Sequence, residues 1–337
     1  MLTGVWVPLV TPFKDGAVDI ASYRRLIEHY IGQGVSGVFP LGTTGEAPAI
    51  DPVEEDAIVA ETVDAVAGRV PIFVGIGGNA TAKVIKTIER LDRYAFSGIV
   101  SVCPYYNRPS QAGMHAHFTA IAAATGRQVL IYNVPYRTSV NLTNETLLRL
   151  AEVPNIVGVK DSAGNMMQSL DLIASRPAGF SVLTGEDALF FPQLCSGMDG
   201  GILASAHLAT DRFIEIARRV AANDHQGARA IWQRLQRFIP SLFAEANPVP
   251  IKYCLWRQGL ITSPECRLPL TSVSPELGKT LDHLLADLAN RASLPLRREL
   301  PTRTAAATTS ATGGAATTTP AAAAAAATTR ARRGRGR

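Results

Sequence analysis

The chain has 337 residues, of which 47% are hydrophobic, and a formal net charge of +5. Residues 293–337 contain eight arginines and one glutamate, a charge of +7, so residues 1–292 carry the remaining −2. A mildly acidic body argues against a nucleic-acid-binding fold, and no uncharged apolar stretch reaches the roughly 20 residues that span a membrane.

The N-terminus and the cysteines are typical of a cytoplasmic protein. Residues 1–10 lack the cationic start and the helical apolar core of a signal peptide. The cysteines, at positions 103, 195, 254 and 266, form no Cys-x-x-Cys pair and suggest no disulfide framework. We therefore expect a cytoplasmic protein with reduced thiols.

Short apolar runs alternate with amphipathic stretches along residues 4–222. The predicted strands are 4–10, 36–41, 71–75, 98–103, 128–134, 156–160, 181–184 and 200–203. The helices that follow them are predicted at 19–33, 51–67, 80–94, 110–125, 143–151, 165–175, 186–196 and 207–222. Eight strand–helix units in succession predict a parallel sheet closed into a (β/α)₈ TIM barrel, an α/β fold.

Further helices are predicted at 225–240, 247–258 and 274–291, too many for the outer ring of a barrel. From about residue 293 the composition shifts to Ala, Thr, Pro, Gly and Arg. Such a segment lacks the large apolar residues that offset the entropy of ordering. The predicted organisation is a barrel at 1–223, a C-terminal helical extension at 224–292 and a disordered tail at 293–337.

A single lysine, Lys160, ends one of the predicted strands, in the sequence Ile-Val-Gly-Val-Lys-Asp. Because side chains alternate along a strand, Ile156 and Lys160 should face the barrel interior, while Val157 and Asp161 face the helices. A lysine at a strand end usually reaches water, but a desolvated amine can form a Schiff base with a carbonyl substrate. Active sites of such barrels lie at these strand ends.

Other strand ends carry hydroxyl groups. Residues 42–46 read Gly-Thr-Thr-Gly-Glu, a turn whose N–H and O–H donors could bind a carboxylate. Residues 104–109 read Pro-Tyr-Tyr-Asn-Arg-Pro, and residues 132–138 read Tyr-Asn-Val-Pro-Tyr-Arg-Thr. Together with Asn-Pro-Val-Pro-Ile-Lys at 247–252 and Arg-Leu-Pro-Leu at 267–270, these segments resemble the dihydrodipicolinate synthase/N-acetylneuraminate lyase family of class I aldolases. The resemblance runs in order through residues 3–290.

The resemblance implies a set of catalytic residues. Lys160 would form a Schiff base with pyruvate, for which its pKa must fall from its ordinary value of ~10.4 by roughly 3 units. Tyr132 would hydrogen-bond near the imine and transfer protons, and Thr43 and Tyr106 would complete a hydroxyl relay. Tyr106 would come from a neighbouring subunit, so we expect a homo-oligomer, a dimer or a dimer of dimers.

The resemblance also implies the residues that bind substrate. The backbone N–H of Thr44 would hold the pyruvate carboxylate, and the carbonyls of Gly185 and Ile202 would line the opposite wall. In the family, an arginine in a Pro-x-Arg-Thr segment, here Arg137, accompanies aspartate semialdehyde as the second substrate, and its donor fork suits a carboxylate. The expected activity is condensation of pyruvate with aspartate semialdehyde to 4-hydroxytetrahydrodipicolinate, in lysine and diaminopimelate biosynthesis.

Some positions depart from the family pattern. Ser139 stands where glycine is usual, and Asp161 where glutamate is common. Asn79 and Tyr105 match members that lysine inhibits, but Lys83 replaces an acid that would bind the ammonium group of the effector. Three further positions of that site also differ, namely Ala47, Pro48 and Glu55. We expect weak inhibition by lysine or none.

Two alternatives to the synthase stay open. One is a related pyruvate-dependent aldolase for a 2-keto-3-deoxy sugar acid or a similar aldehyde, which Ser139 and the altered loop after Glu46 would favour. The other is a barrel that has lost catalysis and serves in binding, against which the retained Lys160 and Tyr132 argue.

Several other signals do not point to a cofactor or a metal. Residues 75–80 match Gly-x-Gly-x-x-Ala, but no acid ends the next strand as a dinucleotide site requires. His115 and His117 are two residues apart on a helix and so face different ways, and Cys103 has no histidine nearby in its motif. The arginine-rich tail could bind RNA or another anionic partner weakly, and its deletion should leave catalysis unchanged.

Overall fold

Eight parallel strands form one sheet in the computed structural model, which describes residues 1–292. They are β1 (Gly4–Val7), β4 (Gly37–Val38), β5 (Phe73–Gly75), β6 (Gly98–Val102), β7 (Gln128–Asn133), β8 (Ile156–Asp161), β9 (Ser181–Thr184) and β10 (Gly200–Ile202). Their order is β4-β1-β10-β9-β8-β7-β6-β5. A parallel bridge between Val38 and Ile72, the residue before β5, joins the two ends of the sheet. The predicted closed barrel is confirmed.

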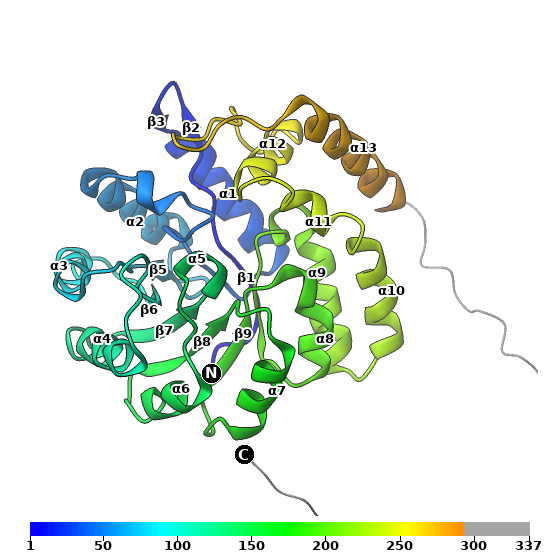
Figure 1. Ribbon diagram of the computed structural model, residues 1–337. Helices are drawn as coiled ribbons and strands as arrows, with labels where there is room; N and C mark the ends of the chain where they lie inside the picture. The colour runs from blue at the N-terminus through cyan, green and yellow to red at the C-terminus, as the bar shows by residue number, and fades with distance from the viewer. Residues whose placement is uncertain (293–337) are drawn as a thin grey trace, which may run out of the picture. The chain divides into compact units, whose positions relative to one another are not determined.

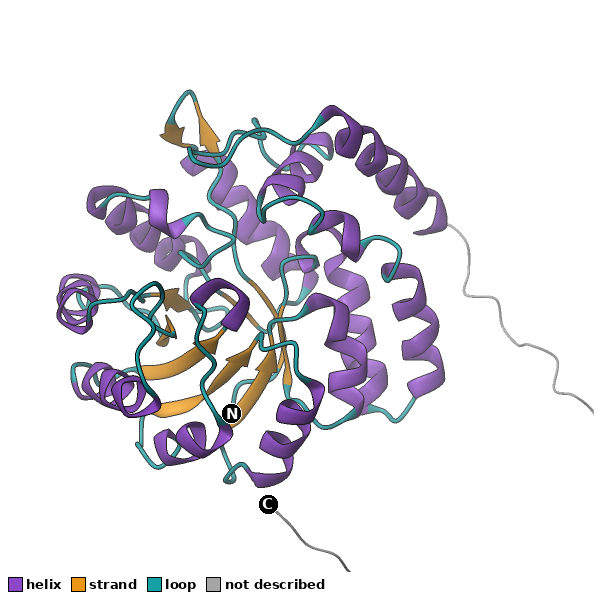
Figure 2. Ribbon diagram, viewed as in Figure 1, coloured by secondary structure: helices purple, strands orange, loops and turns teal. Residues whose placement is uncertain are grey.

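Helices surround this sheet in both ribbon views (Figures 1 and 2). They are α1 (Ile20–Gln33), α2 (Pro52–Val66), α3 (Thr81–Leu91), α4 (Gln111–Ala123), α6 (Asn144–Leu150), α7 (Met166–Ser175), α8 (Phe190–Cys195) and α9 (Ala206–Ala221). Each begins or ends within a few residues of its prediction. The start of α2 is a capping box: Asp51 accepts from the backbone N–H of Glu54, and the Glu54 side chain accepts from the backbone N–H of Asp51.

Four short elements are absent from the sequence prediction. They are the strands β2 (Phe13–Lys14) and β3 (Ala17–Val18), which form a hairpin, the 3₁₀ turn η1 (Ala47–Ala49) and the helix α5 (Pro135–Thr138). The 3₁₀ turn η2 (Asp187–Leu189) stands at the start of the helix predicted at 186–196. The α5 turn begins at a proline, which suits the first position of a helix because its missing N–H has no intrahelical partner there. As a result, Arg137 lies on a helical turn rather than on an extended loop.

Four helices follow the barrel: α10 (His225–Leu235), α11 (Ile239–Leu242), α12 (Val249–Arg257) and α13 (Pro275–Ala292). The predicted helix 225–240 is therefore wrong in part, because α10 ends at Leu235 and a separate turn, α11, begins at Ile239 with Pro240 at its start. The predicted tail at 293–337 lies outside the described residues. In residues 1–292, no helix is long and apolar enough to cross a membrane.

Two apolar clusters form the core. One lies between the sheet and the helices. The other contains residues from most of the strands, including Trp6, Phe73, Leu130 and Leu183, and fills the barrel interior. In it, the rings of Trp6 and Phe73 meet edge to face with centroids 5.4 Å apart. This interior layer closes the barrel beneath the strand ends, where the predicted site residues lie.

The side-chain alternation predicted for β8 is confirmed at one end and wrong at the other. The pairing of β7 with β8 shifts register between Val129 and Leu130. Ile156 consequently belongs to the cluster beneath the helices, and Val157 packs against the interior cluster. Beyond this irregularity the regular alternation directs Lys160 inward, while Asp161 accepts a hydrogen bond from Ser169 on α7.

Candidate active site

A small pocket opens at the carboxyl ends of the strands. Seven of the eight site residues predicted from the sequence line it, from five different strand ends and the loops after them: Thr43, Thr44, Tyr132, Arg137, Lys160, Gly185 and Ile202. Tyr106 is the exception. The agreement follows from the barrel itself, because parallel strands bring their carboxyl ends to one rim.

Lys160 is buried at the floor of this pocket, with 5% of its surface exposed. Its Nζ lies 4.1 Å from the centroid of the Tyr132 ring and 5.2 Å from that of Phe39. Burial lowers the pKa of the Lys160 amine to about 8. The negative charges of Asp187 and Glu186 act to raise this pKa, and the positive charge of Arg137 makes a smaller contribution to lowering it. About a tenth of the amine is thus neutral at pH 7 and able to attack a carbonyl.

Tyr132 is buried beside the amine, and burial raises the pKa of its phenol. The hydroxyls of Ser162 and Thr43 oppose this shift by interacting with the phenol oxygen. Ser162 Oγ is itself fully buried and has no hydrogen bond of standard geometry. Three hydroxyl groups therefore gather around the space next to the amine, of which sequence reasoning found two and missed Ser162.

The turn 42–46 forms one wall. Gly45 N donates to the Gly42 carbonyl at 3.0 Å, and Glu46 N donates to the Thr43 carbonyl at 3.1 Å, which closes the turn on itself. In the described part of the chain, the backbone N–H groups of Thr43 and Thr44 donate to no other protein group. Paired free N–H groups in a glycine-rich turn are a suitable receptor for a carboxylate.

Arg137 lies on α5 at the pocket wall, with its guanidinium 5.2 Å from the centroid of the Tyr136 ring. Within residues 1–288 it forms no salt bridge. Its charge reaches the site, because it adds to the lowering of the Lys160 pKa and opposes the rise that burial causes in the pKa of Tyr132. A guanidinium without an internal carboxylate partner is available to a carboxylate from outside.

Tyr106 does not line the pocket of its own chain. Its side chain is 89% exposed, and its backbone takes a left-handed φ of 73°, which is uncommon for a residue other than glycine. The neighbouring Tyr105 is 40% exposed. Tyr106 is thus held away from the other predicted residues.

Six lining residues were missed in the sequence: Pro8, Tyr136, Asp187, Ala204, Phe243 and Asn247. Asp187 is buried, and its Oδ1 accepts from the backbone N–H of Ser205 at 2.5 Å. Burial, with the charge of Asp187, raises the pKa of the adjacent Glu186 to about 7. The two acids, Glu186 and Asp187, could have been predicted as site residues from the sequence, because they follow the end of β9 closely.

Gly185 is required by the close packing at this point. A Cβ there would lie 2.1 Å from Ser162 Oγ and 2.7 Å from Lys160 Cε. Any side chain would therefore displace the lysine. The glycine predicted as a wall residue also fixes the room available to the nucleophile.

The signals set aside in the sequence have structural explanations. A Cβ on Gly75 would meet the Leu41 carbonyl at 2.0 Å, so close strand packing accounts for this glycine. His117 is buried, and its Nδ1 lies 2.9 Å from Thr81 Oγ1. Burial raises the pKa of the Cys103 thiol to about 12, which makes it an inert packed side chain.

Comparison with known proteins gives consistent matches. The model of the Dihydrodipicolinate synthetase family matches residues 1–288. A relative from Clostridium acetobutylicum, 4-hydroxy-tetrahydrodipicolinate synthase 2, is 49% identical over 284 residues, which are 84% of this chain and 99% of that protein.

Solved structures agree. Dihydrodipicolinate synthase from Thermotoga maritima matches with a TM-score of 0.84 and 33% identity, over 86% of this chain and 99% of that one. The chloride-inhibited dihydrodipicolinate synthase from Acinetobacter baumannii, solved with pyruvate, matches with a TM-score of 0.83 and 35% identity over the same shares. On sequence and fold alike, the chain belongs to the dihydrodipicolinate synthetase family.

Proposed function

We propose that this chain condenses pyruvate with L-aspartate 4-semialdehyde to 4-hydroxytetrahydrodipicolinate, as a Schiff-base aldolase of lysine and diaminopimelate biosynthesis. The observation that carries the proposal is Lys160, a buried amine in the pocket with a pKa lowered to about 8. The relatives' names and the pyruvate in the Acinetobacter baumannii structure support the same activity.

Pyruvate binding would begin at the 42–46 turn. The unpaired backbone N–H of Thr44, with that of Thr43 beside it, would hold the carboxylate, and the carbonyls of Gly185 and Ile202 would line the opposite wall. This arrangement would place the keto carbon against Lys160. Fixing the carboxylate in this way converts the attack into an effectively intramolecular step.

The chemistry would start from the neutral amine. Lys160 Nζ adds to the keto carbon to give a carbinolamine, and loss of water then leaves an iminium. Loss of a methyl proton gives an enamine, whose carbon attacks the aldehyde carbon of the second substrate. The buried phenol of Tyr132 is suited to move these protons, because its raised pKa keeps it protonated and able to donate.

Thr43 and Tyr106 would complete the proton relay. Thr43 interacts with the Tyr132 phenol within one chain. The exposed side chain of Tyr106 would reach the relay of a neighbouring subunit, which makes a dimer, or a dimer of dimers, the proposed assembly. The expected cytoplasmic location also stays a prediction.

Arg137 would bind the carboxylate of the semialdehyde. Its guanidinium lines the pocket and has no internal salt bridge in residues 1–288. The sugar-acid alternative loses its main support at Ser139, whose φ of 60° is the left-handed conformation that glycine would adopt. Its N–H donates to the Pro135 carbonyl at 2.8 Å, so Ser139 ends the α5 turn in the conformation that a glycine at this position would adopt.

The test is consumption of the pyruvate methyl signal, followed by NMR with enzyme, with and without aspartate semialdehyde. The proposal expects consumption that depends on the semialdehyde. Pyruvate that is consumed only with a sugar-derived aldehyde would instead establish the related aldolase, and no consumption with any aldehyde would contradict both.

A further inference from the structure

A buried ion pair joins the 42–46 turn to the C-terminal extension. Lys252 Nζ on α12 lies 2.7 Å from Glu46 Oε1, and the two side chains are 0% and 2% exposed. The second oxygen, Oε2, accepts from the backbone N–H of Arg267 at 2.9 Å. Removing two charges from water is costly, and such pairs are poor stabilisers compared with apolar residues of the same volume.

Glu46 determines the end of the turn. Its φ of 55° is left-handed, a conformation that costs roughly 1–2 kcal/mol for a residue with a side chain and needs support from its surroundings. Next to it, the Gly45 carbonyl accepts from Thr11 Oγ1 at 2.7 Å. The side-chain contacts of Glu46 hold this strained residue two positions from Thr44.

A second contact reaches the turn from the same part of the extension. Asn247, two residues before α12, donates from Nδ2 to Thr44 Oγ1 at 2.9 Å. Within the turn, Thr44 is thus attached to the residues just before α12, and Glu46 is attached to α12 itself. Both contacts join residues more than 200 positions apart in the chain.

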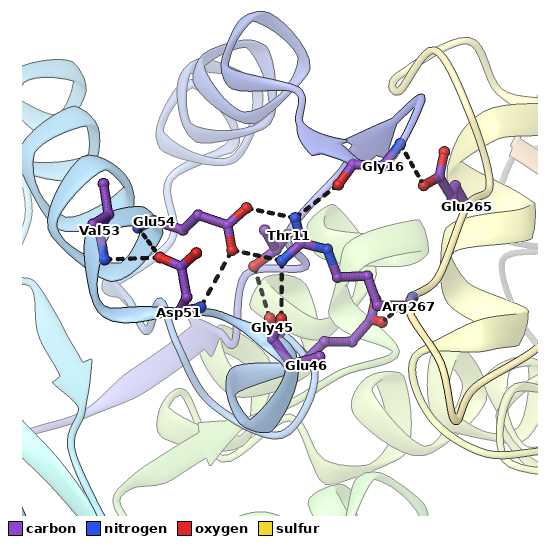
Figure 3. Close-up of polar contacts among 10 residues, drawn as sticks. Thr11, Gly16, Gly45, Glu46, Asp51, Val53, Glu54, Glu265 and Arg267 are labelled. Carbon is purple, nitrogen blue, oxygen red and sulfur yellow. Dashed lines mark hydrogen bonds and ion pairs between the residues drawn. The ribbon is translucent and has the colours of Figure 1, made fainter.

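Arg267 extends this attachment beyond the turn (Figure 3). Its guanidinium donates to the Ala49 and Gly16 carbonyls, each at 2.8 Å, and forms a salt bridge with Glu54 at the capped start of α2. The residues that follow the turn are therefore fixed to the same C-terminal segment that supplies the backbone N–H to Glu46.

We propose that Glu46 and Lys252 are positioning residues, through which α12 holds the 42–46 turn in the geometry that receives the pyruvate carboxylate. The proposal rests on the proposed function, since it assigns the turn to pyruvate. The C-terminal extension thereby completes the active site although, apart from Phe243 and Asn247, it supplies none of the residues that line the pocket.

The experiment measures the KM for pyruvate, kcat and the free energy of unfolding in Lys252→Met and in the double variant E46Q/K252M. The single variant leaves the buried carboxylate of Glu46 without its partner, so its kinetics are compared with the wild type only if it folds. The double variant carries no unpaired buried charge. A loosened turn should raise the KM for pyruvate by roughly tenfold, with a smaller change in kcat.

Arg176→Met is the matched control. Arg176 forms a salt bridge with Asp199, and both side chains are largely buried. Asp199 directly precedes β10, which places this pair at the opposite end of the barrel. The control should lower the free energy of unfolding and leave the KM for pyruvate unchanged.

A folded E46Q/K252M enzyme with the wild-type KM for pyruvate would overturn the proposal, because the pair would then serve stability alone. Failure of the part of the proposed function on which this proposal rests, namely pyruvate binding at Lys160, is distinguishable, since the wild-type enzyme itself would then form no borohydride-trapped adduct with pyruvate. At saturating pyruvate, both variants should still be labelled at Lys160.

Discussion

At the scale of single residues, the proposed chemistry depends on how the neighbours of Lys160 set its pKa. Burial lowers the pKa to about 8, while Asp187 and Glu186 act in the opposite sense. At pH 7, about a tenth of such an amine is neutral. The rate constant kcat/KM for pyruvate should therefore rise roughly tenfold per pH unit below this pKa and level off above about 8.

Arg137→Met tests the residue assigned to the second substrate. Loss of the guanidinium should raise the KM for aspartate semialdehyde by roughly 100-fold, because a charge-assisted bidentate contact is lost. It should also move the rising limb of the pyruvate pH profile to higher pH, since the Arg137 charge helps to lower the pKa of Lys160.

The exposed Arg149 on α6 provides the control, and Arg149→Met should change neither quantity. Steady-state kinetics across a pH series give both readouts. Wild-type semialdehyde kinetics in Arg137→Met would contradict the assigned role.

Most of the site residues that sequence reasoning found lie near a strand end in a recognisable local motif, while Gly185 and Ile202 came from the family resemblance alone. Lys160 was identifiable because it ends an apolar run, and Thr44 because two glycines enclose it. Asn247 was not, because its contact with Thr44 spans 203 positions and depends on how the extension folds back. Ser162 was missed because a serine after a strand has no distinctive pattern.

At the scale of elements, local irregularities decided what could be predicted. Strict alternation along β8 placed Lys160 correctly but misplaced Ile156, because the register shift beside Val129 reverses the faces. The helix α5 was hidden in a motif that was read only as a loop. In both places, backbone pairing rather than side-chain pattern set the geometry.

Helix α3 carries the clearest prediction at this scale. Lys83 is exposed on α3, where it would repel the ammonium group of a lysine effector, and Glu55 is paired with Arg90. Free lysine should therefore leave the initial rate almost unchanged. Lys83→Glu should increase the sensitivity to lysine. Inhibition of the wild-type enzyme at sub-millimolar lysine would show the prediction to be wrong.

At the scale of the whole molecule, the closed barrel followed from counting alternating elements, but its long-range polar contacts did not. The link between Glu46 and Lys252 joins residues 206 positions apart, and neither residue lies in a pattern that indicates the other. Buried charges of this kind become visible only when the fold brings them together.

Buried His207 should make the stability of the fold sensitive to acid. It is buried, its Nε2 accepts from the Val10 N–H at 3.2 Å, and its Nδ1 lies 2.8 Å from the Ala204 carbonyl. Burial lowers the pKa of His207 to about 4 from its ordinary 6.5. The imidazole of His207 binds a proton more readily in the unfolded chain than in the folded one. The contribution of this group to the free energy of unfolding, present in full above pH 6.5, is therefore lost as the pH falls toward 4.

The loss from this one group should reach about 3 kcal/mol of unfolding free energy. Urea denaturation at a series of pH values measures it. His207→Gln should make the dependence shallower, although buried His117, whose pKa burial also lowers to about 4, still contributes to it. His283→Gln, on the exposed surface of α13, should keep the wild-type slope. A wild-type stability that is constant between pH 6.5 and 5 would refute this account.

The central claim is that Lys160, and no other amine, attacks pyruvate. Borohydride reduction in the presence of pyruvate, followed by peptide mass spectrometry, tests it most directly. Lys252 is an internal comparison, because it is also buried and its pKa is also lowered. The account predicts one reduced pyruvate adduct, on Lys160, and none in Lys160→Ala. An adduct on Lys252, or no adduct in the wild-type enzyme, would contradict it.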